Sequence, residues 1–180
     1  MTFVLPRGRA VLLAGAALLF GACSPTFNWR EVPIGGEGEL VALLPCKPDR
    51  ARRDLPLGDR SVPVTMIGCE AGGATFAVAL ASADDAAQAD GWLGAWKRQA
   101  QTQWAGGRIE ERSAVVNHAA VAPAPWLLEA AGGRQHQQVR QLWFAHRQRN
   151  GAVSLYQATV LGTPSAAEAT QTFFEGLRLP

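Results

Sequence analysis

The stretch QQVRQLWFAHRQRNGAVSLYQATVL, residues 137–161, decides the fold class. Two apolar segments, 137–147 and 152–161, have the length and composition of strands. Arg149, Asn150 and Gly151 lie between them, and Asn-Gly is a strong signal for a hairpin turn because both residues tolerate positive φ. This stretch therefore predicts two antiparallel strands joined by a short turn.

Upstream of this hairpin, from Asp84 onward, apolar residues recur every three or four positions instead of every second position. The change predicts a helix from Asp84 to about Trp104, capped by Ser82 or Asp84 and ended by Gly106-Gly107. Its apolar stripe consists of Ala89, Trp92, Leu93, Trp96, Ala100 and Trp104.

Shorter signals complete the fold. Gly72-Gly73 predicts a hairpin between two of the strands, and residues 47–60 read as a polar, proline-rich loop. Ser165 and Glu168 match the capping box of a closing helix, with Ala169, Phe173 and Leu177 as its buried stripe. Five further strands are expected at 39–44, 62–67, 74–81, 108–116 and 126–131.

These elements predict an α+β fold: one antiparallel sheet of about six strands, packed by two main helices in a single domain at residues 39–180. Ahead of it, the prolines and glycines of residues 24–38 predict a flexible tether, part of a lipidated N-terminal segment at 23–38. Phe27 and Trp29 are expected to dock on the domain rather than on the membrane interface.

Residues 1–22 have the parts of a secretory signal peptide. Arg7 and Arg9 give a positive start, and residues 10–22, AVLLAGAALLFGA, form an uncharged run that is short for a membrane span. The following Phe20-Gly21-Ala22-Cys23 resembles the lipobox of bacterial lipoproteins, although leucine is usual where Phe20 stands.

The resemblance implies that the leader is removed and that Cys23 is acylated, which would place the domain on a membrane facing the periplasm. Ser24 follows the cysteine, and in enterobacterial members of this family a residue other than aspartate favours the outer membrane. Two alternatives stay open: an uncleaved anchor, and an ordinary signal peptidase site beside an incidental Cys23.

Cys46 and Cys69 are the remaining cysteines, and in an oxidising periplasm they predict one disulfide that closes a loop of 22 residues. Such a closure contributes about 3 kcal/mol. The alternatives are a redox-active pair, which the absence of C-x-x-C spacing disfavours, and a metal site, for which two cysteines are too few.

Four segments resemble the layout of the PsbP-like α/β fold, which also occurs in bacterial lipoproteins. They are GELVALLPCKP (38–48), TFAVAL (75–80), SLYQATVLG (154–162) and FFEGLRL (173–179), with the long helix between the second and third. The resemblance implies the fold alone, and no metal or photosystem function is carried over.

No catalytic, metal or cofactor motif stands out. His118, His136 and His146 lack zinc spacing, and there is no G-x-S-x-G elbow or P-loop lysine. The carboxylates at Asp84, Asp85 and Asp90 suit a helix start, and those at Glu110 and Glu111 suit an exposed strand edge. We therefore expect no enzyme, no metal and no cofactor.

Charge disfavours nucleic acid as a partner. Without Arg7 and Arg9 the mature chain has 15 basic and 15 acidic residues, so no broad positive field is present. Arg50, Arg52 and Arg53 are offset by neighbouring aspartates and read as a solvated loop.

The predicted function is a non-enzymatic binding or scaffolding domain, held on the membrane by acylated Cys23 and acting on other envelope proteins. The alternative is a carrier or sensor of a lipid or acyl chain. In that alternative Trp92, Trp96 and Trp104 line a cleft, whereas in the first interpretation they are core against the sheet.

Overall fold

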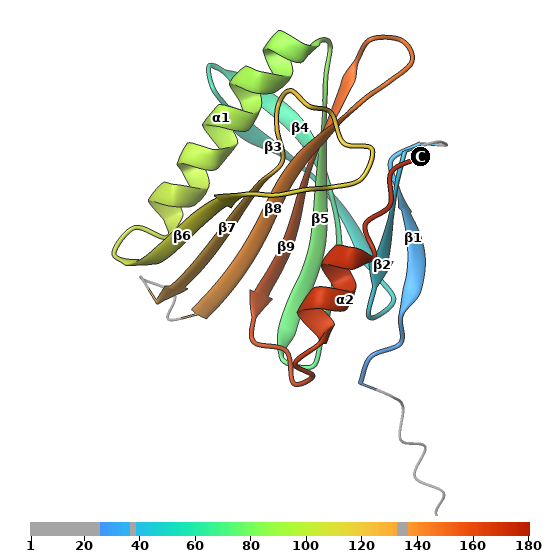
Figure 1. Ribbon diagram of the computed structural model, residues 1–180, viewed down its shortest axis with the longest axis vertical. Coiled ribbons are helices and arrows are strands. Elements are labelled where there is room, and N and C mark those ends of the chain that lie inside the picture. Colours follow the sequence, from blue (N-terminus) through green and yellow to red (C-terminus); the bar gives the residue numbers. More distant parts are fainter. Residues whose placement is uncertain (1–25, 37–38, 133–136) are drawn as a thin grey trace, which may run out of the picture.

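A seven-stranded antiparallel sheet runs through the middle of the molecule (Figure 1). The computed structural model describes residues 26–36, 39–132 and 137–180, which form a single α+β domain. The strand order is β3-β4-β5-β9-β8-β7-β6. The strands are β3 (Asp49–Leu57), β4 (Arg60–Ala71), β5 (Ala74–Ala83), β6 (Gly107–Ser113), β7 (Trp126–Gly132), β8 (Gln137–Arg147) and β9 (Val153–Gly162).

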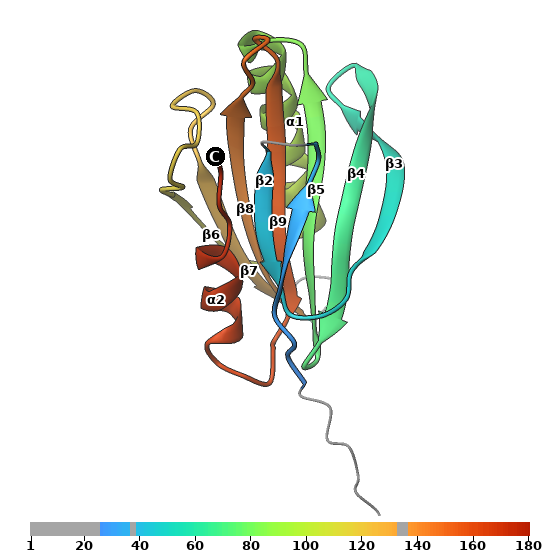
Figure 2. The same cartoon turned by 90° about the vertical axis from the view of Figure 1, so that its right-hand side faces the viewer.

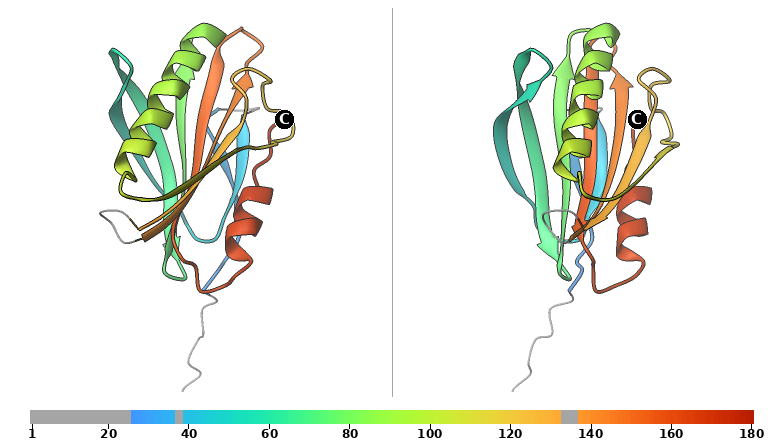
Figure 3. Two further views of the ribbon diagram at one scale, coloured as in Figure 1. Left: turned by 60° about the vertical axis from the view of Figure 1, so that its left-hand side comes forward. Right: turned by 90° about the vertical axis from the view of Figure 1, so that its left-hand side faces the viewer.

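Helix α1 (Ala86–Gln103) lies across one face of this sheet (Figure 3). Asp85 caps the helix, because its carboxylate accepts a hydrogen bond of 2.8 Å from the Gln88 N–H. The predicted caps, Ser82 and Asp84, are therefore wrong by one to three residues. The helix buries Ala89, Leu93, Trp96 and Ala100 against alternate residues of the strands.

The opposite face is covered by a second layer (Figure 2). It consists of the two-stranded antiparallel sheet β1 (Arg30–Ile34) and β2 (Leu40–Leu44), together with helix α2 (Ala169–Glu175). The chain beyond α2 runs beside β2, where Val41 and Arg178 exchange backbone hydrogen bonds of 2.8 and 2.9 Å. The sheet thus has a hydrophobic core on each face, one under α1 and one under this layer.

The fold class is confirmed, with seven strands in the main sheet instead of about six and a second small sheet. Both predicted hairpins form: Ala71 pairs with Ala74 around Gly72-Gly73, and Arg147 pairs with Val153 around the Asn150-Gly151 turn. Both glycines of the first turn have positive φ, 58° and 83°, which matches a primed hairpin turn.

The loop predicted at residues 47–60 is wrong. Most of it is β3, an edge strand in register with β4 from Asp49–Gly68 to Leu57–Arg60. Residues 49–54 are exposed on both faces, so the strand lacks the alternation of apolar and polar residues that identifies a half-buried strand. Its charges and Pro56 suit an edge that must not recruit another strand.

The flexible tether predicted at residues 24–38 is wrong for Arg30–Ile34, which is β1. Val32 and Ile34 of this strand are buried, and Pro33 is tolerated because β1 pairs on one side with β2. The docking of Phe27 and Trp29 on the domain is confirmed, since both rings pack against the core beneath β1 and β2.

The capping box predicted at Ser165 and Glu168 does not form. Helix α2 begins at Ala169, and no side chain caps it. The Ser165 N–H instead donates to the Gly72 carbonyl at 2.7 Å, which holds the preceding turn against the β4–β5 hairpin. Ala169, Phe173 and Leu177 are buried as expected.

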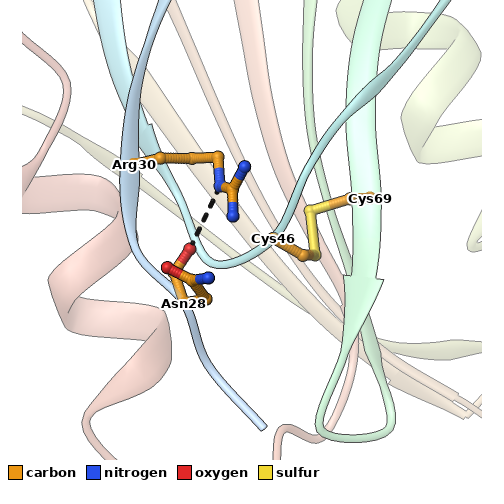
Figure 4. The surroundings of a disulfide bond; sticks show 4 residues. All are labelled: Asn28, Arg30, Cys46 and Cys69. Atoms are coloured by element: carbon orange, nitrogen blue, oxygen red, sulfur yellow. Dashed lines mark hydrogen bonds between the residues drawn. A yellow bond between two sulfur atoms is a disulfide. The ribbon is translucent and has the colours of Figure 1, made fainter. Parts of the chain in front are cut away.

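The disulfide predicted between Cys46 and Cys69 is present, with Cα atoms 6.0 Å apart (Figure 4). Cys46 follows β2, and Cys69 lies in β4. The bond therefore joins the small sheet to the main sheet covalently. Nearby, the Arg30 guanidinium donates to the Asn28 carbonyl at 3.4 Å, at the start of β1.

Candidate functional site

A groove lies between α2 and the main sheet, on the face that α2 only partly covers. It consists of two adjoining cavities of about 520 and 270 Å³, which share Arg140 and Gln171 in their walls. Helix α2 and the turn before it form one side, and β6, β7 and β8 form the floor. We call this feature the α2 groove.

Charged side chains of both signs fill the floor of the α2 groove. The register places Glu110, Glu129 and Arg140 side by side across β6, β7 and β8. Arg108 and Arg112 lie two residues to either side of Glu110 on β6, so all five point to the same face. The floor therefore presents three guanidinium groups and two carboxylates.

Ion pairs with arginines offset the repulsion between two neighbouring glutamates in this row. Glu110 and Glu129 are directly opposite each other, an arrangement that destabilises a sheet when both are charged and unpaired. Arg112 binds one oxygen of Glu129 at 2.8 Å, Arg140 binds the other, and Arg108 pairs with Glu110. Glu129 is the least exposed of the five at 23%, so it is the centre of the network.

The smaller cavity has an apolar wall. Leu127 and Leu142 continue the rows of the floor, Phe174 of α2 faces them half-buried, and Ala114 closes one side. Its polar groups come from Arg112, Arg140, Gln171 and Glu175. A bound group would thus meet charges in both cavities and a hydrocarbon wall in the smaller one.

The groove is lined by charged, amide and hydroxyl side chains together with apolar ones. Its polar groups are those of Arg, Glu, Gln and Thr, and no His, Cys, Ser, Asp or Lys is among the described residues that line it. Thr163 and Thr170 supply the hydroxyl groups among these lining residues. The groove can hold charges and hydrogen-bond a ligand.

A second polar cluster lies at the other end of the same face and is sealed. The Tyr156 hydroxyl donates to Glu39 at 3.4 Å, and the Gln148 amide donates to Glu39 at 3.0 Å and to Ser154 at 2.7 Å. Burial, reinforced by the nearby Glu39 carboxylate, raises the pKa of Tyr156 far above its usual value. Ser154 is 1% exposed, so no substrate can reach its hydroxyl.

The tryptophans of α1 belong to the core. Trp96 and Trp104 are 4% and 2% exposed, and Trp92 packs half-buried against the same cluster. All three lie on the α1 face of the sheet, away from the α2 groove. Trp96 and Trp104 are thus core residues, and Trp92 borders the same core. The acyl-chain carrier stays a prediction.

Other candidates from the sequence are dispersed. Cys23 and His136 lie outside the described residues. His118 binds the Pro180 carbonyl through Nδ1 at 2.8 Å, while His146 is on β8. Among residues 26–36, 39–132 and 137–180, no three His, Cys, Asp or Glu side chains gather as metal ligands.

The acidic residues and the arginines singled out in the sequence have several different contacts in the structure. Asp85 serves the start of α1, and Glu111 accepts from Gln101 of α1 at 2.7 Å. Glu110 and Glu111 are both exposed on the edge strand β6, as expected, and Glu110 also lines the α2 groove. Arg50 donates to the Pro33 carbonyl at 3.1 Å, which fastens β3 to β1.

Sequence reasoning missed the five charged residues of the groove floor. The signal was present, because Arg108, Glu110 and Arg112 alternate with period two along one strand. Glu129 is a charge inside the otherwise apolar segment LLEAA, and Arg140 is the one charge in QVRQLWF. A charge at an inward position of a strand indicates either an uncovered face or a paired site.

Comparison with known proteins gives no family assignment: no protein-family model matches the chain, and no curated protein matches it. Neither helix in the described part of the chain has the length and apolarity needed to cross a membrane.

Proposed function

We propose that this chain is an envelope lipoprotein, anchored through acylated Cys23 and facing the periplasm, whose domain binds a segment of another envelope protein in the α2 groove. The observation that carries the binding role is the groove floor, where three arginines and two glutamates lie on a sheet face that α2 only partly covers. A surface of both signs complements a polypeptide, which also carries both signs, better than it complements a ligand of one charge.

The lipid anchor is supported by the order of features around Cys23: a positive start, an uncharged run, a lipobox-like cleavage region and then the cysteine. The disulfide between Cys46 and Cys69 agrees with an oxidising compartment. By the Ser24 criterion the outer membrane is the proposed destination.

Anchoring is tested by metabolic labelling with radioactive palmitate in cells that produce the full chain or its Cys23→Ser variant. We expect label on the first protein and none on the second, which should be left unprocessed or released into the periplasm. Equal labelling of both proteins would contradict acylation at Cys23.

Binding in the groove is tested by photo-crosslinking in the native envelope. A benzophenone amino acid replaces Gln171, which is exposed on the rim of the groove, or Asp59, which is exposed in the β3–β4 turn as a matched control. We expect one discrete adduct from position 171 alone, and we expect Arg140→Glu to remove it. An adduct that survives this charge reversal, or equal adducts from both positions, would contradict the assignment.

A second candidate, the binding of an acyl chain, is favoured by the wall of Leu127, Leu142 and Phe174 beside Arg140. The test is the ¹³C spectrum of carboxyl-labelled myristate titrated with the purified domain and with its Phe174→Ser variant. A carboxyl shift that the variant abolishes would support this candidate. An unchanged spectrum would remove it.

A further inference from the structure

The chain enters the fold at a fixed point, Phe27. Its ring lies 6.0 Å from the Trp29 ring and 6.4 Å from the Phe76 ring, in stacked and edge-on geometry. The next residue is held as well, because the Asn28 N–H donates to the Pro45 carbonyl at 2.7 Å. Together with β1, these contacts tie the start of the described chain to the main domain.

The covalent distance from Cys23 to this point is short. Phe27 is four residues after Cys23, and four residues span at most about 14 Å when fully extended. A tether of 15 residues, as the sequence first suggests, would allow tens of ångströms and any orientation. Because Phe27 is held on the domain, the distance that the chain can span between Cys23 and the domain is much shorter than a 15-residue tether would allow.

One end of the domain surrounds the entry point. It consists of the Gly72-Gly73 turn and the chain from Gly162 to Ala167, which we call the entry end. A Cβ atom on Gly72 would collide with both the Phe27 ring and the Ser165 hydroxyl, so these three residues are in immediate contact. The two turns contain no charged side chain, the nearest in sequence being Glu70 and Glu168.

We propose that the entry end is the membrane-facing surface of this protein and that its occupant is the headgroup layer of the bilayer that holds Cys23. This inference depends on the lipid anchor proposed above. The short linker brings Phe27 within about 14 Å of the lipid attachment. The two turns themselves carry no charge that an anionic leaflet would repel, and the exposed Glu70 and Glu168 flank them.

This orientation decides what the rest of the molecule faces. The α2 groove opens beside Gly162, Thr163 and Pro164, so its wider cavity lies at the bilayer. Strand β8 has 11 residues and extends about 35 Å from the entry end. At its far end, the Ala120 N–H donates to the Ala145 carbonyl at 2.7 Å, and there Val121 is 91% exposed, away from the membrane.

The test uses the full acylated protein in vesicles of phosphatidylethanolamine and phosphatidylglycerol that contain a rhodamine-labelled lipid. A single fluorescent donor is attached at Ser165→Cys, on the entry end, or at Val121→Cys, on the far loop. Both side chains are exposed, Cys46 and Cys69 form the disulfide, and the proposed acylation would occupy Cys23. We expect energy transfer to the lipid to be roughly twofold or more stronger from position 165, because the ends are about 35 Å apart. Equal transfer, or stronger transfer from position 121, would overturn the proposal.

Two controls separate the orientation from the anchor. Mass spectrometry of the purified protein shows whether Cys23 carries acyl chains, so a failed anchor is recognised independently of the energy-transfer result. A variant with a 15-residue Gly-Ser spacer between Cys23 and Phe27 should lose most of the contrast between the two positions, since the spacer reaches tens of ångströms. An undiminished contrast in the spacer variant would overturn the claim that linker length sets the orientation.

Discussion

At the scale of single residues, Tyr156 gives the clearest expectation, because it is the only tyrosine of the chain. Burial first, and the Glu39 carboxylate second, raise the pKa of its hydroxyl far above the value in an unfolded chain. A raised pKa in the folded state means that the stabilisation is complete below pH about 10 and is lost as the pH rises above it.

We therefore expect the tyrosinate absorbance at 295 nm to appear only with alkaline unfolding, and not as a separate titration of the folded protein. In Tyr156→Phe the free energy of unfolding should fall by about 1 kcal/mol at pH 7 but depend less on pH above 10. Burial lowers the pKa of Lys97, an effect of opposite sign that both proteins share. Reversible tyrosinate formation near pH 10 in the folded protein would contradict the burial of this hydroxyl.

Gly176 provides a second test at this scale. A Cβ atom here would collide with Leu43 of β2, although the backbone φ of −80° is ordinary for any residue. We expect Gly176→Ala to lower the free energy of unfolding by about 1–3 kcal/mol, because overpacking must displace α2 or β2. Gly36→Ala is the matched control, since no atom lies within 4 Å of its Cβ position. Urea denaturation should show a smaller midpoint for the first variant alone.

At the scale of elements, the disulfide is expected to stabilise the fold through the unfolded chain. Cys46 and Cys69 are 23 residues apart, and a closed loop of that size contributes about 3 kcal/mol. The Cys46→Ala/Cys69→Ala variant and the reduced native protein should therefore both melt at a lower temperature in calorimetry, and to the same extent. A reduced protein as stable as the oxidised one would contradict this expectation.

Phe173 is the largest side chain that helix α2 buries in the core. Phe173 is fully buried, and its ring meets Phe76 of β5 edge-on at 5.6 Å. Phe173→Ala should cost about 3–5 kcal/mol and release the wall of the α2 groove. Hydrogen exchange should then show faster amide exchange in α2 than in α1. Uniform loss of protection in both helices would instead indicate global destabilisation.

The elements also show what the sequence could predict. The β4–β5 and β8–β9 hairpins could be predicted because Gly-Gly and Asn-Gly favour the positive φ angles that tight hairpin turns need. Helix α1 was accessible because its stripe buries against a sheet. Strand β3 was not, since residues 49–54 are exposed and show no alternation. Strand β1 was not, since it has only two buried residues, Val32 and Ile34, on either side of Pro33. Pairing partners leave little local trace in a sequence.

At the scale of the whole molecule, the sequence indicated the class of fold but not the site. The five charges of the α2 groove come from β6, β7 and β8, and they become a row only when the strand register is known. The tryptophan stripe attracted attention by composition, yet it is the ordinary core of the opposite face. In this protein the conspicuous tryptophans are packing residues, whereas the groove is lined by arginines and glutamates of the kind found on any protein surface.

The covalent bond between the two sheets also has a mechanical consequence. A pull on an anchored Cys23 would reach the fold through Phe27 and would first peel β1 and then β2 from their neighbours. The unravelling chain becomes taut at Cys46, where the load passes through the disulfide to Cys69 in β4, the strand next to the edge strand β3. Under tension only the segment ahead of Cys46, which includes β1 and β2, would therefore unfold and extend. The residues between the two cysteines would bear no force, because the disulfide carries it.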